Sequence, residues 1–245
     1  MKDRFSANAN HYAQFRPGYP PELFDFIYHH MHRFDTAWDC GTGNGQAARE
    51  LSLKFTKVFA TDISAQQLEH AYQAENIFYS ISSEPSLFDD HSVDLITIAQ
   101  AAHWFDMKKF SREAKRVLKA DGIIAVWGYG LLTMNVEIDR LIHHFYKMVI
   151  GAYWDEERKH IDEQYMNLQF PFEEIQTPSF TISVLWSLQE LRGYLSTWSA
   201  AQKYISIKGQ DPVKTLIAEV EVYWRNEKQL VNFPLFLKLG SSGAP

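Results

Sequence analysis

The stretch that decides the fold is Ala37-Trp38-Asp39-Cys40-Gly41-Thr42-Gly43-Asn44-Gly45-Gln46, in which three glycines alternate with other residues. A short apolar run precedes it and a helical pattern follows it. Glycine adopts turn conformations closed to other residues, and its missing Cβ atom lets a ligand approach the main chain closely. The pattern is therefore typical of a loop that binds a nucleotide-type ligand.

An acidic residue follows at the distance such a loop requires. Asp62 ends the β-rich run 57–61 and lies 21 residues after Gly41. This spacing predicts a carboxylate at the tip of the second strand, where it can accept hydrogen bonds from ribose hydroxyls.

The glycine spacing also separates ligand classes. A dinucleotide fingerprint reads G-x-G-x-x-G, but this chain has Gln46 where the third glycine would stand, and it has no P-loop lysine pattern. A phosphate-bearing ligand is therefore disfavoured. A nicotinamide-dependent oxidoreductase and a glycine-rich turn that binds nothing remain the alternatives at this point.

Strand and helix patterns alternate along the first half of the chain. Expected strands are 36–40, 57–61, 76–82, 93–99 and 123–127, and expected helices are 20–33, 46–55, 66–73 and 107–119. This alternation predicts an α/β fold with a doubly wound, mostly parallel sheet, whose ligands bind at the carboxyl ends of the strands.

The second half departs from this alternation. Helices are expected at 135–150, 155–167, 188–197 and 212–226, with a strand at 180–186 and an edge strand at 230–239 that tolerates Pro234. We expect a single domain over 1–245. Its parts would be an N-terminal lid and helix (1–33), a cofactor-binding core (34–129), a helical cap insertion (130–178) and the rest of the sheet with further helices (179–245).

Composition narrows the classes of partner. Twenty-four basic and thirty acidic side chains give a net charge of −6 without a run of like charge, so no nucleic-acid partner is expected. No segment has the roughly twenty apolar residues needed to span a bilayer, and the single cysteine, Cys40, suits a reducing compartment. We expect a cytoplasmic protein without membrane association. The histidines show no metal-ligand spacing, so no metal is expected. The oligomeric state stays open, a monomer included.

Further segments carry a family resemblance. Asp39 before the glycines, Asp62-Ile63-Ser64 with Gln67, Ser83-Glu84 ahead of Asp94, and the segment 99–106 together resemble the class I S-adenosylmethionine-dependent methyltransferases. Tyr12, Arg16-Pro17-Gly18-Tyr19 and His103-Trp104-Phe105 resemble the type 11 subgroup that includes the trans-aconitate methyltransferases and related small-molecule enzymes. The resemblance implies a Rossmann-like, seven-stranded sheet and S-adenosyl-L-methionine as cofactor, with S-adenosyl-L-homocysteine as product.

The resemblance also assigns roles on the cofactor side. Asp62 would hold the ribose, Ile63 would pack on the adenine, and Gln67 stands where methionine is usual. The cofactor-binding residues it implies are Tyr12, Arg16, Tyr19, Asp39, Gly41, Gly43, Gly45, Asp62, Ile63, Gln67, Ser83, Glu84, Gln100 and Ala101. Among these, Tyr12, Arg16 and Tyr19 would form a lid, with Arg16 near the cofactor carboxylate.

The acceptor side is assigned by position. Trp104, Trp154, Arg158, Tyr165 and Trp198 are the candidate substrate-binding residues. Through the subgroup, the favoured reaction is O-methylation of a small carboxylic acid, which needs no base. A hydroxyl or amine acceptor would need one, and His103 is the candidate catalytic residue; a histidine that only fixes its loop is the alternative. A non-catalytic S-adenosylmethionine-binding sensor or partner platform is the competing function.

Overall fold

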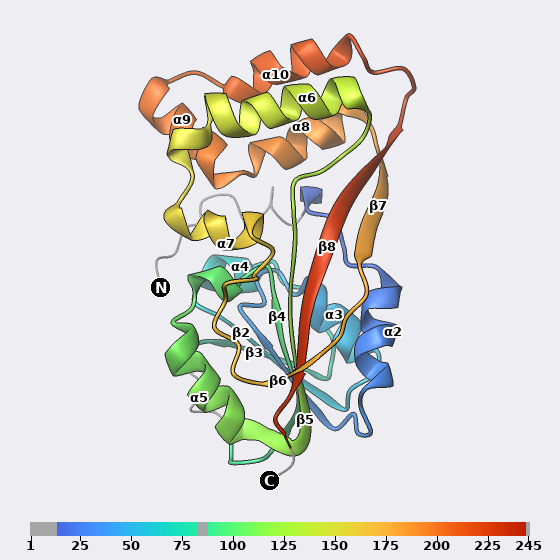
Figure 1. The fold of residues 1–245 in the computed structure, drawn as a ribbon, viewed down its shortest axis with the longest axis vertical. Coiled ribbons are helices and arrows are strands. Elements are labelled where there is room, and N and C mark those ends of the chain that lie inside the picture. Colours follow the sequence, from blue (N-terminus) through green and yellow to red (C-terminus); the bar gives the residue numbers. More distant parts are fainter. Residues whose placement is uncertain (1–13, 83–87, 244–245) are drawn as a thin grey trace.

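The computed structural model describes residues 14–82 and 88–243. Within these residues one eight-stranded sheet has the order β3-β2-β1-β4-β5-β8-β6, and β7 pairs with β8 (Figure 1). The strands are β1 Thr36–Cys40, β2 Lys57–Asp62, β3 Ile77–Ile81, β4 Val93–Ala99, β5 Leu118–Tyr129, β6 Glu173–Ile175, β7 Phe180–Trp186 and β8 Gln229–Ser241. All seven expected strands are present, and the three-residue β6 is the eighth.

The helices fall into two groups. Those among the parallel strands are α2 Pro21–His29, α3 Gln46–Ser52, α4 Ala65–Glu69 and α5 Met107–Val117. Those after β5 are α6 Val136–His144, α7 Lys159–Asp162, α8 Leu188–Ser196, α9 Ser199–Lys208 and α10 Pro212–Glu221. Single turns of 3-10 helix occupy Ala102–Trp104, Gly151–Tyr153 and Glu156–Arg158, and Phe145–Val149 is a π-helical turn.

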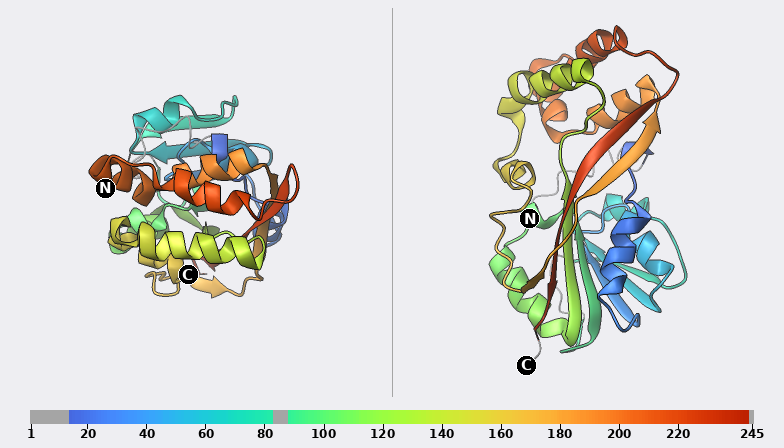
Figure 2. Two further views of the ribbon diagram at one scale, coloured as in Figure 1. Left: turned by 90° about the horizontal axis from the view of Figure 1, so that it is seen from above. Right: turned by 45° about the vertical axis from the view of Figure 1, so that its right-hand side comes forward.

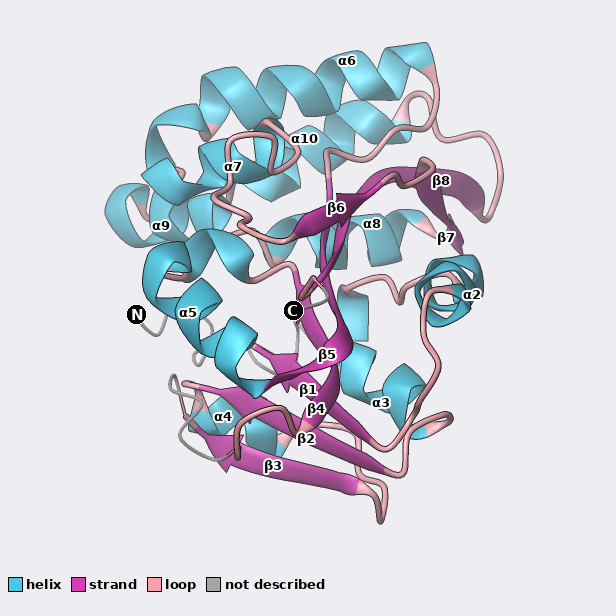
Figure 3. Ribbon diagram, turned by 60° about the horizontal axis from the view of Figure 1, so that its bottom comes forward, coloured by secondary structure: helices cyan, strands magenta, loops and turns pink. Residues whose placement is uncertain are grey.

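The parallel half of the sheet is covered on both faces. Strands β1 to β5 pair in parallel, and β4 is buried along six of its seven residues. Neighbouring residues of β4 and β5 belong to two separate apolar cores: Leu95 to the core that includes residues of α2 and α3, and Ile96 to the core that includes residues of α5. Figure 3 shows α5 on one side of these strands and α2 with α3 on the other. The predicted doubly wound, mostly parallel sheet is confirmed.

The strand β8 corrects one expectation. It is not an edge strand, because its second half pairs with β5 on one side and β6 on the other, while its first half pairs with β7. Pro234 is tolerated because pairing to β5 stops at Leu235, one residue away, and the Pro234 carbonyl accepts from the Gly130 amide. The lost donor therefore falls beyond the end of the ladder.

A layer of helices lies beyond the carboxyl ends of the parallel strands. In Figures 1 and 2 it contains α6, α8, α9 and α10, so segments on both sides of β7 build it. The helix α9 was not expected from the sequence, and the continuous helix expected over 155–167 is wrong. That segment is broken because Gln164 and Tyr165 have φ angles of 52° and 58°, outside the helical region.

Candidate active site

The glycine loop leaves β1 across the end of β2. The amides of Gly41 and Thr42 donate to the Thr61 carbonyl over 2.8 and 3.0 Å, which turns the chain sharply after Cys40. Gly41, Gly43 and Gly45 all have positive φ angles, of 71°, 56° and 79°. Residues with a Cβ atom adopt this left-handed conformation only at a cost in free energy, so the turn requires glycine at these three positions.

The three glycines have different surroundings. A Cβ atom on Gly41 would lie 2.7 Å from the Ala101 Cβ atom, and one on Gly45 would collide with the Tyr79 hydroxyl. At Gly43 the nearest atom is the Gln67 Oε1, at 3.9 Å. Gly41 and Gly45 are therefore needed for packing, whereas at Gly43 the space that a side chain would take is open, so its main chain is bare.

Asp39 holds the loop from below. Its side chain is fully buried and accepts hydrogen bonds from the hydroxyls of Thr42 and Thr97, so it joins the loop to β4. Burial raises the pKa of Asp39 to about 6, against the lowering effect of those two hydroxyls. Asp39 is therefore a structural support of the loop.

Asp62 reaches the loop from the end of β2. Its carboxylate accepts the Gly43 amide over 2.8 Å and the Ser64 amide over 2.9 Å. Ser64 in turn caps α4 by accepting the Gln67 amide. Gln67 is 3% exposed, with its side-chain amide beside Gly43, and Ile63 is half-buried. A carboxylate therefore stands next to the bare glycine backbone, as the sequence predicts.

The N-terminal segment closes over the same edge. The Arg16 Nη1 atom donates to the Tyr129 hydroxyl over 3.0 Å, and the guanidinium lies 5.1 Å from the centroid of the Tyr194 ring. The Gln46 Nε2 atom donates to the Arg16 carbonyl over 3.2 Å, and Tyr19 packs edge-on against Trp127. Arg16 and Tyr19 thus lie near the glycine loop. The predicted Tyr12, Ser83 and Glu84 lie outside the described residues.

The end of β4 supplies two more predicted residues. Gln100 has a φ angle of 54°, an uncommon conformation for a residue with a side chain, and its Nε2 atom donates to the Tyr129 carbonyl over 3.2 Å. Ala101 is buried against Gly41. Strained backbone of this kind occurs most often at functional sites, where the surrounding contacts maintain it.

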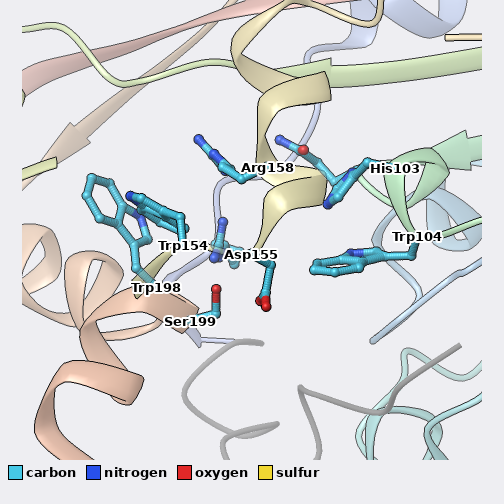
Figure 4. A pocket seen from close by; sticks show the side chains of 9 residues that line it. His103, Trp104, Trp154, Asp155, Arg158, Trp198 and Ser199 are labelled. Carbon is cyan, nitrogen blue, oxygen red and sulfur yellow. The ribbon is translucent and has the colours of Figure 1, made fainter. Parts of the chain in front are cut away.

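A pocket opens between this edge and the helical layer (Figure 4). Its empty space, counted out to the open mouth, is about 520 Å³. The lining residues are Arg16, Gln100, His103, Trp104, Trp154, Asp155, Arg158, Trp198 and Ser199. It thus joins predicted cofactor-side residues to the predicted catalytic residue and to four of the five predicted substrate residues.

The fifth, Tyr165, does not line the pocket. It is 0% exposed, and its hydroxyl lies 3.0 Å from the Nδ1 atom of His103. The His103 imidazole has its pKa lowered to about 3, by burial first and then by the charges of Arg158 and His160. His103 is therefore neutral at physiological pH.

Arg158 forms part of the pocket wall. Its guanidinium carbon lies 4.9 Å from the centroid of Trp154 and 5.4 Å from that of Tyr146. Its Nε atom donates to the Tyr146 hydroxyl over 2.8 Å and lies 3.6 Å from the Asp162 carboxylate. Aromatic faces and these two partners hold the guanidinium in one orientation.

Asp155 brings a negative charge into the pocket wall. Its side chain is 9% exposed and pairs with the Lys203 Nζ atom over 2.6 Å. Of the three charged residues that line the pocket, Asp155 is thus paired with Lys203, as Arg158 is with Asp162.

Two tyrosines of the site were missed by sequence reasoning. Tyr129 accepts from Arg16 and Gln100, and Tyr146 accepts from Arg158 and donates to Asp162. The aromatic-rich stretch 145–204 was a signal for Tyr146. Tyr129 had none, because its partner Arg16 is 113 residues away.

Among residues 14–82 and 88–243, no helix has both the length and the apolar character to cross a bilayer. The same residues hold no group of three or more His, Cys, Asp or Glu side chains arranged for a metal ion.

The fold and the site define an α/β protein with an adenosine-type cofactor loop below a helical layer. Residues 38–126 match the model of the type 11 methyltransferase domain. A Dictyostelium discoideum protein named as a methyltransferase is 34% identical over 97% of this chain and 94% of its own length. The chain therefore belongs to the methyltransferase family.

Other relatives agree. A solved structure described as a type II methyltransferase from Anaeromyxobacter dehalogenans superposes with a TM-score of 0.87 and 31% identity, covering 94% of this chain and all of that one. A Saccharomyces cerevisiae protein named as an S-adenosylmethionine-dependent methyltransferase is 25% identical over 62% of this chain, which spans 57% of that protein's length.

The family is S-adenosylmethionine-dependent, and the residues present fit this cofactor. Gly43 offers bare backbone beside the Asp62 carboxylate, which is what an adenosine needs, and the turn lacks the third glycine of a pyrophosphate-binding loop. Asp62, the loop glycines and Arg16 are the residues that would hold it. The cofactor supplies an electrophilic methyl group on a positively charged sulfur.

Proposed function

We propose that the protein methylates a small organic acid on a carboxylate oxygen. The observation that supports this is the place of Arg158, a guanidinium held on aromatic rings in the wall of a pocket that also contains Arg16 and Gln100 from the cofactor side. A planar guanidinium pairs well with a carboxylate.

The chemistry of the pocket agrees with an acidic acceptor. A carboxylate is already an anion at neutral pH, so its oxygen can attack a methyl group without losing a proton. His103 has a pKa lowered to about 3 and is a weak proton acceptor, so a hydroxyl or amine acceptor would find a poor base here. The trans-aconitate methyltransferases, which the N-terminal segment resembles, support the same choice.

The chain's own residues act by placement. Trp104, Trp154 and Trp198 form apolar walls that exclude water, and Arg158 holds the acceptor by its charge. Holding the attacking oxygen in line with the departing sulfur contributes several kcal/mol of barrier lowering without a protein nucleophile.

The test is a methyl-transfer assay with matched acceptors. Small carboxylic acids, their primary amides and the corresponding alcohols are incubated with S-adenosylmethionine, and S-adenosylhomocysteine and the product mass are measured. We expect esters, one CH₂ heavier than the acid, from the acids alone. Cofactor binding without S-adenosylhomocysteine across the panel would instead favour a non-catalytic sensor.

A variant pair connects the activity to the pocket. Arg158→Gln should raise the KM for the acid at least tenfold, because one charge-assisted hydrogen bond contributes about 1.5–3 kcal/mol, and leave cofactor affinity unchanged. The matched control is Arg112→Gln on the exposed face of α5. An equal KM for both variants would remove Arg158 from acceptor binding.

A further inference from the structure

Tyr165 lies behind the pocket wall in a position that its surroundings fix. It is 0% exposed, and its ring stands edge-on to Phe236, with 5.1 Å between centroids and an interplanar angle of 89°. Its backbone amide donates to the His160 carbonyl over 2.8 Å, and its carbonyl accepts from the Leu168 amide. The φ angle of 58° is rare for a bulky residue and must be maintained by these contacts.

The Tyr165 hydroxyl meets one specific nitrogen of His103. The distance from the hydroxyl oxygen to Nδ1 is 3.0 Å, and His103 itself lines the pocket. Figure 4 shows the His103 ring in the pocket wall, and because its Nδ1 atom lies against the hydroxyl of a fully buried tyrosine, we take Nε2 as the nitrogen that a ligand in the pocket can reach. What Nε2 presents to a ligand therefore depends on which nitrogen carries the proton.

The chemistry of the pair decides the direction of the hydrogen bond. A phenol, with a reference pKa near 10, is a proton donor, whereas an imidazole, whose conjugate acid has a pKa near 6.5, is much the more basic partner. The O–H group of Tyr165 therefore donates to Nδ1, which leaves the ring proton on Nε2. The alternative bond would run from an Nδ1–H group to the phenol oxygen. It is less favourable, because a neutral imidazole N–H is a weaker acid than a phenol and a phenol oxygen is a weaker base than an imidazole nitrogen.

We infer that Tyr165 is a positioning residue, which fixes His103 in the tautomer protonated at Nε2 so that its imidazole presents an N–H donor to the pocket. The ring stays neutral in this arrangement, because burial and the positive charge of Arg158 disfavour a second proton. The inference about the tautomer stands on this contact alone; its consequence for the acceptor rests on the proposed function.

The consequence concerns the class of acceptor. The Nε2–H group of His103 and the guanidinium of Arg158 are both donors on the same pocket, so the wall favours an oxygen anion. A neutral hydroxyl group would bring its own proton toward a site without a basic nitrogen. Tyr165 and His103 thus act together to select a carboxylate over an alcohol.

The tautomer can be read directly by nitrogen NMR. The protein is labelled with ¹⁵N-histidine, and the ring signals of His103 are assigned by their loss in His103→Gln. We expect Nε2 in the range of a protonated ring nitrogen and Nδ1 in the range of an unprotonated one, in the protein without ligands. The reverse assignment would overturn the inference, whether or not any acid is methylated.

The variant Tyr165→Phe removes the hydroxyl and keeps the ring. We expect the His103 signals to move toward values averaged over both tautomers, and kcat/KM for an acid to fall about tenfold with cofactor affinity unchanged. The control is Tyr28→Phe, which also removes a buried hydroxyl but lies on α2, and should leave the His103 signals in place. An unchanged tautomer in Tyr165→Phe would refute the positioning role. If both tyrosine variants have a lowered melting temperature, the spectra of the wild-type protein still decide the tautomer.

Discussion

Gln46 donates its side-chain amide to the backbone carbonyl of Arg16, so the first residue of α3 fastens the N-terminal segment to the glycine loop. The same amide lies 3.5 Å from the Pro17 carbonyl. The residue that distinguishes this loop from a dinucleotide fingerprint therefore has a use of its own. It couples the loop to Arg16, whose guanidinium lies at the pocket.

Replacing Gln46 should loosen this connection. Gln46→Leu keeps the size of the side chain and removes the donor, at a cost of about 1 kcal/mol for a neutral hydrogen bond. We expect the dissociation constant for S-adenosylmethionine, measured by calorimetry, to rise about fivefold while the melting temperature changes little. The control is Gln210→Leu in an exposed loop. Equal affinities for the two variants would show that the contact does not serve the cofactor.

Asp62 is the residue on which cofactor recognition most depends. Asp62→Asn keeps an oxygen for one of the two amides of Gly43 and Ser64, but removes the negative charge. We expect cofactor affinity to fall by about 1.5–3 kcal/mol, the scale of hydrogen bonds to a charged group. The control is Asp25→Asn on the exposed face of α2. Calorimetry that finds wild-type affinity in Asp62→Asn would remove this carboxylate from the ribose site.

The local part of this site could be predicted from the sequence, and the long-range part could not. The glycine turn, Asp62 and the strand ends follow from short-range patterns, and the structure places them together. The contact between Arg16 and Tyr129 and the central place of β8 depend on residues over a hundred positions apart. Pro234 suggested an edge strand because nothing in the sequence tells where the pairing with β5 stops. The helix expected over 155–167 was wrong at Gln164 and Tyr165, whose φ angles are positive and the second of which is buried against Phe236 and His103, residues distant in the sequence.

Alanine substitutions at two of the loop glycines should separate effects on stability from effects on cofactor binding. Gly43→Ala should cost about 1–2 kcal/mol of stability, because alanine is less stable than glycine in a left-handed backbone conformation. Gly41→Ala has the same backbone cost and also places a Cβ atom 2.7 Å from that of Ala101. We expect Gly41→Ala to lower the urea midpoint much more than Gly43→Ala. Gly43→Ala should lose cofactor affinity beyond its loss of stability. If Gly41→Ala proved as stable as Gly43→Ala, the contact with Ala101 would not be tight.

The last prediction concerns Asp39 and pH. Burial raises its pKa to about 6 in the folded protein, above an unfolded value near 4, so the folded state binds the extra proton between these values. Stability from this group is therefore lost as pH rises from about 4 to about 6 and is constant above, a change of roughly 3 kcal/mol. Asp39→Asn cannot ionise and should not show this fall. Its free energy of unfolding, measured in urea, should therefore rise relative to that of the wild type as the pH increases from about 4 to about 6. Parallel profiles from pH 4.5 to 7.5 would show that Asp39 ionises normally beneath the loop.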